Sequence, residues 1–329
     1  MPDLHTTYLG LSLQSPLVVS ASTLSEEIEN IREMERQGAG AVVLFSLFEE
    51  QIELEEMGHA DYYATHIDSL PEELRDVARM NEFKVGASAY LAHLYQVKQA
   101  VSMPVIASLN GYYSGGWTRY ARLLEAAGAD AIELNTYYLA NDRLTTSAEV
   151  EQMYLRLVSD VVSAVDIPVA VKLSPYFTAM THMAHELDAA GAHALVLFNR
   201  FYQPDFDVEN ETVTPSIDLS TPQELRLRLR WTALLFGHLK AELAITGGVH
   251  DATGVVKSLM AGAQVAMMTS AIYKHGLDHI GNTLMALDSW LAEHGYDSVD
   301  DIRGRLCVFS AGNAAAFERA NYMRVLKSY

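Results

Sequence analysis

Short apolar segments alternate along the chain with longer stretches in which apolar residues recur at helical spacing. One order repeats four times: an apolar segment, a helical stretch, a Gly-Ala turn and a second apolar segment. The eight apolar segments are residues 16–22, 41–46, 104–110, 131–136, 168–174, 194–199, 243–249 and 265–270. They lack the regular polar alternation of a strand with one face in water, so the pattern predicts buried parallel strands.

The stretches between these segments predict the helices that connect the strands. They are residues 26–37, 117–127, 150–165, 178–190, 222–239 and 253–260. A helix in each connection makes neighbouring strands parallel, and eight such strands close most naturally into a (β/α)8 TIM barrel. A doubly wound open sheet is the competing fold. The strand count, the chain length of 329 residues and the glycines expected to end the helices favour the barrel.

We therefore expect a single barrel domain over residues 1–329, with further helices from residues 277–329 on its outside. Two connections are longer than a barrel needs. An insertion at about 50–99 after the second strand is acidic and rich in tyrosine, and residues 201–219 after the sixth strand are rich in aspartate. Long loops at the carboxyl ends of barrel strands commonly build active sites or subunit contacts.

Lys172 stands at the end of a fully apolar strand, in the sequence IPVAVKLS. A lysine is seldom buried without a partner, so this position predicts an anionic or polarisable group beside it. The alternative is a surface lysine whose stem alone is buried.

Residues at the other strand ends are mostly amides, hydroxyls and glycines, with Glu133 as the one carboxylate. Such a set is poor in metal ligands and suits a planar, hydrogen-bonding cofactor. Gly247-Gly248 and Thr269-Ser270 end the seventh and eighth strands. Barrels often bind phosphate there, because bare backbone N–H groups can approach its oxygens; ordinary turn residues are the alternative.

Composition narrows the classes of partner and cofactor. A formal net charge of -19 argues against nucleic acid or an anionic membrane as a partner, since both would repel the chain. Cys307 is the one cysteine, which excludes an internal disulfide and a cysteine-held cluster. No signal peptide or membrane span is evident, so we expect a cytoplasmic protein. Histidine pairs at helical spacing lack a third ligand nearby, and we expect no metal site.

The segments TTYLGLSLQSPLVVSAS, PVAVKLSPYF, TGGV and MMTSAIYKHG resemble the dihydroorotate dehydrogenase family, in order over most of the chain. The resemblance implies an FMN-containing barrel that oxidises a CH–CH group of a small molecule in pyrimidine biosynthesis. It also implies a homodimer of the family's soluble class, with an unidentified electron acceptor. The cofactor-binding positions implied are Ala21, Ser22, Ser46, Asn110, Asn135, Lys172, Asn199, Gly247, Gly248, Thr269 and Ser270. Lys172 would stabilise the negative charge that reduced FMN tends to carry.

The substrate side departs from the family pattern. A catalytic cysteine or serine is expected after the fourth strand, where this chain has Tyr137 and Tyr138. Phe45 replaces a second lysine, and the asparagine-rich turn after the sixth strand reads Asn199-Arg200-Phe201-Tyr202. A family asparagine has no counterpart near residues 83–89. The catalytic residues predicted are therefore Tyr138, Tyr137 and Lys172.

Three functions remain open from the sequence. The chain oxidises dihydroorotate or a related dihydropyrimidine, with Tyr138 or a water molecule as the base. Alternatively, it reduces an activated C=C bond, with Tyr137 or Tyr138 as the proton donor, because a tyrosine phenol is a poor base but a serviceable acid near neutral pH. A third possibility is an FMN subunit that only transfers electrons to a partner, through a surface near residues 205–211. Tyrosines that merely pack beside the cofactor are the competing interpretation of the pair.

Overall fold

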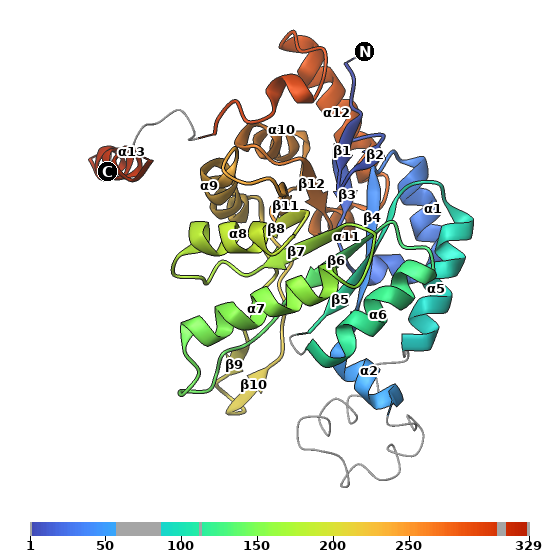
Figure 1. Cartoon of the computed structure of the whole chain (residues 1–329). Helices are drawn as coiled ribbons and strands as arrows, with labels where there is room; N and C mark the ends of the chain where they lie inside the picture. Colours follow the sequence, from blue (N-terminus) through green and yellow to red (C-terminus); the bar gives the residue numbers. More distant parts are fainter. Residues whose placement is uncertain (1, 57–86, 112–113, 308–313, 328–329) are drawn as a thin grey trace.

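The computed structural model describes residues 2–56, 87–111, 114–307 and 314–327. Its centre is a closed barrel of parallel strands surrounded by helices (Figure 1). The barrel strands in chain order are β3 (Leu17–Val19), β4 (Ala41–Phe48), β5 (Val105–Asn110), β6 (Ala131–Asn135), β7 (Val169–Leu173), β8 (Ala194–Leu197), β11 (Glu242–Thr246) and β12 (Val265–Met268). Each predicted apolar segment overlaps one of these strands, so the (β/α)8 fold is confirmed.

Helices follow the strands and cover the outside of the barrel (Figure 1). The principal helices are α1 (Ile28–Arg36), α5 (Ala87–Ala100), α6 (Ser114–Ala126), α7 (Ser147–Val162), α8 (Met180–Ala189), α9 (Leu225–Leu235), α10 (Ala252–Ala261) and α12 (His279–Glu293). Shorter or outlying ones are α2 (Glu49–Glu56), α11 (Ser270–His275), α13 (Ala314–Leu326) and the 3-10 helices η1 (Thr23–Glu26), η3 (Pro222–Glu224) and η4 (Asp300–Ile302). α12 packs on α10 as expected, whereas side chains 319–326 of α13 are exposed.

The alternation of side chains along each strand gives the protein two hydrophobic cores. Outward-facing residues such as Val171 and Leu195 pack against the helices and form the larger core. Inward-facing residues form a second core inside the barrel, and many of them are alanines, such as Ala131, Ala170 and Ala244. Successive side chains of a strand point to opposite faces, so apolar runs can serve both cores at once.

The space left by these alanines is filled from the amino-terminal end of the barrel. Two short antiparallel strands, β1 (Thr6–Tyr8) and β2 (Leu11–Leu13), form a hairpin there (Figure 1). The hairpin contributes Tyr8, Leu9 and Leu13 to the inner core. The apolar pattern did not predict this hairpin, because its strands are only three residues long. The base of the barrel is thereby closed, and open space is left at the carboxyl ends of the strands.

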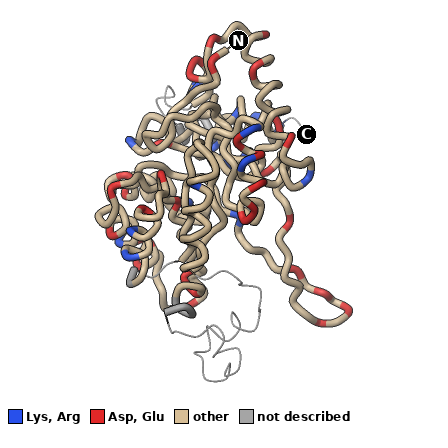
Figure 2. Tube along the Cα trace, turned by 90° about the vertical axis from the view of Figure 1, so that its right-hand side faces the viewer, with Lys and Arg blue, Asp and Glu red and all other residues tan. Residues whose placement is uncertain are grey.

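The two long connections differ in how much of them the structure describes. Between β4 and β5, α2 and α5 account for the two ends of the predicted insertion, and residues 57–86 lie outside the described residues. Residues 201–219 include a second hairpin, β9 (Asp205–Asp207) and β10 (Thr212–Thr214), which projects from the barrel (Figure 1). Apart from half-buried Asp207, this hairpin is exposed along both strands, and it carries several acidic residues (Figure 2).

A search of the described helices finds none whose length and apolar character would allow it to cross a lipid bilayer.

The closure of the barrel base by Tyr8 leads to a first prediction. Tyr8 is 1% exposed, and its hydroxyl has no hydrogen-bond partner among the described residues. Tyr8→Ala opens a cavity and should lower the free energy of unfolding by about 3–5 kcal/mol. Tyr8→Phe keeps the ring and removes an unpaired buried hydroxyl, so the free energy should stay unchanged or rise by up to about 1 kcal/mol. Urea denaturation measures both, and a clear loss in Tyr8→Phe would show that the hydroxyl is bonded in solution.

Candidate active site

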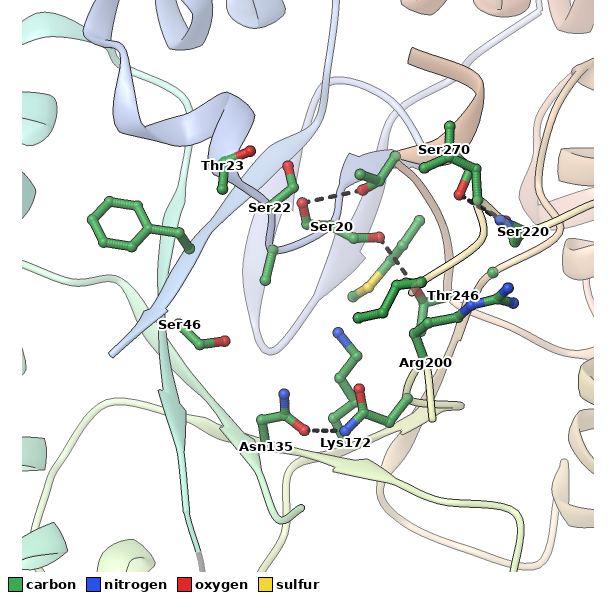
Figure 3. Close-up of a pocket in the computed structure, with 18 of the residues that line it drawn as sticks. Ser20, Ser22, Thr23, Ser46, Asn135, Lys172, Arg200, Ser220, Thr246 and Ser270 are labelled. Carbon is green, nitrogen blue, oxygen red and sulfur yellow. Dashed lines mark hydrogen bonds between the residues drawn. The ribbon is translucent and has the colours of Figure 1, made fainter. Parts of the chain in front are cut away.

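A cavity of about 720 Å³ opens at the carboxyl ends of the barrel strands. Side chains that line it come from strand ends all around the barrel (Figure 3). The eleven positions predicted to bind a cofactor all belong to its lining: Ala21, Ser22, Ser46, Asn110, Asn135, Lys172, Asn199, Gly247, Gly248, Thr269 and Ser270. Volumes of this size are typical of sites that enclose a small molecule or a cofactor.

The change from an apolar base to a polar mouth can be followed along single strands. On β6, the inward positions run from Ala131 through Glu133 to Asn135, and on β7 they run from Ala170 to Lys172. Because only alternate residues face inward, the last inward position of a strand is the one that meets the cavity. Sequence reasoning from strand ends therefore found the lining residues.

Lys172 forms a buried ion pair with Glu133 of the neighbouring strand. Its Nζ lies 3.2 Å from Glu133 Oε1, and the two side chains are 8% and 1% exposed. Figure 3 shows the Lys172 amine pointing into the cavity, so it is accessible to a bound group while it contacts Glu133. The sequence singled out both residues but did not predict the pair. The strand register could have revealed it, since Ala170 is level with Glu133 and Lys172 is the next inward residue.

Hydrogen bonds between side chains hold the polar groups of the mouth in place. Asn199 Nδ2 donates to Asn135 Oδ1 across 2.5 Å, from the loop after β8 to the end of β6 (Figure 3). The hydroxyl oxygens of Ser46 and Ser108 are 2.9 Å apart. The hydroxyl oxygens of Ser20, directly after β3, and Thr246, at the end of β11, are also 2.9 Å apart. Groups fixed in this way need little rearrangement to contact a bound molecule.

The glycine pair directly follows β11, which lies between β8 and β12 in the barrel. Gly247 and Gly248 both have φ of +86°, a left-handed conformation that favours glycine. A Cβ on Gly248 would lie 2.5 Å from the backbone nitrogen of Leu225, so a larger residue would collide with the start of α9. The Gly248 N–H donates to Ser220 Oγ at 3.1 Å, and Ser220 Oγ lies 2.9 Å from Ser270 Oγ. Backbone and hydroxyl groups thus gather here as an anion site requires.

Arg228 is a cavity residue that sequence reasoning missed. It is 6% exposed, and it donates through Nε to the carbonyl of Thr246 and through Nη1 to the carbonyl of Glu224, each at 2.8 Å. Burial lowers the pKa of Arg228, while the charge of Glu224 acts in the opposite direction. Its spacing along the helix could have revealed it, because Arg228 lies on the same buried face of α9 as Leu225 and Thr232.

Arg200 is the second arginine of the cavity lining. Its Nη1 lies 2.5 Å from Glu224 Oε2, and this pair is about one third exposed. Such a partly exposed pair contributes little to stability. It does set the direction of the Arg200 side chain at the edge of the site.

Two of the three predicted catalytic residues are not brought to the cavity. Tyr137 and Tyr138 are absent from its described lining, whereas Lys172 belongs to it. The Tyr137 hydroxyl accepts the N–H of Tyr202 at 2.8 Å, and its ring packs 5.2 Å from that of Phe201. Tyr138 packs against the outer core and lines a separate hollow near α7. The structure therefore does not group the tyrosines with Lys172, and their catalytic role stays a prediction.

A search of the described residues for three or more histidine, cysteine, aspartate or glutamate side chains that could hold a metal ion finds no such group.

Known proteins resemble this chain along almost its whole length. Residues 3–291 match the family model described as "Dihydroorotate dehydrogenase". A relative from Methanothermobacter thermautotrophicus named "Dihydroorotate dehydrogenase B (NAD(+)), catalytic subunit" is 26% identical over 311 residues, 92% of this chain and 97% of the relative. Relatives with the same name from Thermoplasma volcanium and Pyrococcus abyssi are 24% and 26% identical, over 92% of this chain and 98% of each relative. These matches confirm the resemblance predicted from the sequence.

The close approach at Gly248 gives the second prediction, for which Gly10 is the matched control. Both glycines have positive φ, but a Cβ on Gly10 would meet nothing within 4 Å. Gly10→Ala should therefore cost only the left-handed strain, about 1–2 kcal/mol in the free energy of unfolding. Gly248→Ala adds a collision with the backbone of Leu225 and should cost at least about 1 kcal/mol more, within the range of backbone strain at functional sites. Thermal unfolding measures the difference, and equal losses would mean that α9 moves aside freely.

Proposed function

Because the chain belongs to the dihydroorotate dehydrogenase family, we propose that it is an FMN-dependent oxidoreductase that oxidises a CH–CH group of dihydroorotate or a related dihydropyrimidine. The family match establishes a dihydroorotate dehydrogenase-like oxidoreductase. One observation carries the proposal of FMN: a single cavity gathers the eleven residues that the family resemblance assigns to the cofactor.

The residues of the cavity fit the two ends of FMN. At one end, two glycines with positive φ and the hydroxyl of Ser270 offer backbone and side-chain donors to a phosphate. At the other end, Lys172 and the amides of Asn135 and Asn199 suit a planar ring with hydrogen-bonding edges. The Ser220 hydroxyl already accepts the Gly248 N–H, so a phosphate would share or replace that contact.

When it is bound, FMN supplies a two-electron acceptor for the hydride of a substrate C–H bond. The chain itself supplies position and charge. Lys172 holds an ammonium at the ring end of the cavity, where water is largely excluded and a fixed charge acts strongly. Phe45, Phe198 and Met267 add apolar surface to the lining and keep water away from the polar groups.

For the proton, we propose Tyr138 in preference to Tyr137. The Tyr137 hydroxyl accepts a backbone N–H and links the loop after β6 to the loop after β8, which favours a structural role. Use of Tyr138 requires its loop to turn toward the cavity when substrate binds, as active-site loops commonly do. A water molecule in the base role is the alternative, and the reduction of an activated C=C bond remains the competing reaction.

We also propose that the protein works with an electron-accepting partner as a cytoplasmic homodimer. Three relatives carry the name of a catalytic subunit, which supports a partner chain. The exposed β9–β10 hairpin bears Asp205, Asp207, Glu209 and Glu211 beside the mouth of the barrel. An acidic surface there would attract a basic partner surface. The homodimer rests on the family resemblance, and the cytoplasm on the single cysteine.

Cofactor binding provides the third prediction. Ser270→Asp places a carboxylate where the phosphate would bind, and like charges at such a distance cost several kcal/mol. We expect FMN affinity to fall by at least about 100-fold, with riboflavin affinity much less affected because riboflavin lacks the phosphate. Fluorescence titration of the apoprotein measures both constants. Ser289→Asp, on an exposed turn of α12, is the matched control and should bind FMN normally. Wild-type protein that binds no FMN would contradict the proposed function.

The fourth prediction concerns the substrate and the tyrosines. Mixed without oxygen in a stopped-flow instrument, dihydroorotate should bleach the bound flavin. Tyr138→Phe should slow that reduction by about 10²–10⁴-fold, the usual contribution of a positioned acid or base, and Tyr137→Phe by only a few-fold. Both variants should retain wild-type FMN affinity.

The competing reaction is tested with the same protein. If an enone reoxidises the reduced flavin and dihydroorotate fails to reduce the oxidised flavin, the chain reduces a C=C bond. If neither compound reacts, the chain catalyses neither of the two organic reactions, and electron transfer to a partner is the remaining function. Equal rates in the two tyrosine variants would contradict the role proposed for Tyr138.

A further inference from the structure

The ion pair of Lys172 and Glu133 lies directly beneath the site proposed for the cofactor. Glu133 points into the barrel from the middle of β6, one inward step below Asn135, and it is 1% exposed. Within the described ranges, its hydrogen-bond partner is Lys172 Nζ at 3.2 Å. The ammonium therefore stands between a buried carboxylate below and the cavity above.

Three other ionisable groups near the barrel interior or the cavity edge are either engaged elsewhere or neutral. Glu242 also faces the barrel interior, but it accepts the N–H of Leu9 at the base. Tyr8 is buried in the same interior, where burial first, and then the charges of Glu133 and Glu242, raise its pKa well above the ordinary value. It is therefore a neutral neighbour. At the edge of the cavity, Arg200 is paired with Glu224.

A buried ion pair is poor evidence of a stabilising role. Apolar residues of similar volume often serve a protein core as well or better, because two charges must be removed from water. Apart from hydroxyls such as that of Ser108, which is level with Glu133 on the neighbouring β5, the inner core around this pair is built from alanine, valine, isoleucine, leucine and methionine with Tyr8. An apolar pair would suit such surroundings. The carboxylate beneath Lys172 therefore matters for its charge and not for packing.

We propose that Glu133 is a positioning residue that lowers the reduction potential of the bound cofactor through Lys172. The inference rests on the proposed function, since it takes FMN as the occupant of the cavity. A lone ammonium favours the electron-rich form of the group beside it. Glu133 offsets that effect in two ways. It holds the Lys172 ammonium toward the barrel interior and away from the cofactor, and its own negative charge disfavours added electrons on the cofactor, because the interior between them has a low dielectric constant. The cofactor thus remains able to pass its electrons onward.

The decisive measurement is the midpoint potential of the FMN-loaded protein, by equilibration with reference dyes at a fixed pH. Glu133→Gln is nearly the same size and removes the charge. We expect it to shift the equilibrium between oxidised and reduced cofactor at least tenfold toward the reduced form, a rise of about 30 mV for a two-electron couple. Glu242→Gln is the matched control, because it replaces a half-buried inward-facing carboxyl group at the base of the barrel, where that group accepts the Leu9 N–H and does not contact Lys172. Its potential should stay within about 10 mV of wild type, a third of that step.

Two further variants separate positioning from a structural role. Glu133→Asp keeps the charge but draws it back by one methylene, and its potential should lie between those of wild type and Glu133→Gln. In a Lys172→Met background, Glu133→Gln should produce a smaller shift than in wild type, because the ammonium through which Glu133 acts is gone. If Glu133→Gln fails to fold, the Glu133→Asp potential decides alone.

An unchanged potential in a folded Glu133 variant that binds FMN overturns this inference and leaves the proposed function intact. Equal shifts in Glu133→Gln and Glu242→Gln also overturn it, since the effect would then be one of total charge. Wild-type protein that takes up no FMN overturns both proposals before any potential is measured.

Discussion

A lysine enclosed in a protein must have its charge compensated, and in this barrel one buried carboxylate provides the compensation. Lys172 and Glu133 lie on neighbouring strands and meet inside the barrel, with 8% and 1% of their side chains exposed. Loss of one partner from such a pair typically costs about 3–5 kcal/mol, because the other charge stays buried and unpaired. Each residue therefore constrains the other. The barrel can present an ammonium to its cavity only because a carboxylate is held one inward step below it.

This arrangement depends on the different filling of the two ends of the barrel. Near the amino-terminal end, inward positions are mostly small or apolar, and the hairpin of β1 and β2 inserts Tyr8 among them. Near the carboxyl end, inward positions carry hydroxyls, amides and the amine. A dry base keeps water from reaching the ion pair from below, and the weak screening there strengthens the effect of each charge on the cavity. The hairpin of β1 and β2 at the base thus strengthens the electrostatic effect of the ion pair on the cavity at the mouth.

Much of this could be predicted from the sequence, because the information lies within single strands. An apolar run marks a strand and its last inward residue marks the cavity, so residues such as Asn135, Lys172 and Gly248 could be placed at the cavity from the sequence. Contacts that depend on the register between strands or on the face of a helix were missed, as with Glu133 under Lys172 and Arg228 on α9. The hairpin at the base was too short to produce a pattern. The tyrosine pair was placed by its position after a strand, but loop conformation decides where a loop side chain points.

The same distinction separates the part of the site that matches the family pattern from the part that departs from it. Groups that suit the cofactor stand on strands or directly at their ends, where backbone hydrogen bonds fix them to within a narrow range. The loops after β6 and β8 carry Tyr137, Tyr138 and Arg200, at positions where the family resemblance leads one to expect other residues. Loops accept substitutions that strands of a closed barrel cannot. A barrel can therefore keep the residues at its strand ends while its loops change, and this chain is 26% identical to a relative over 97% of that relative's length.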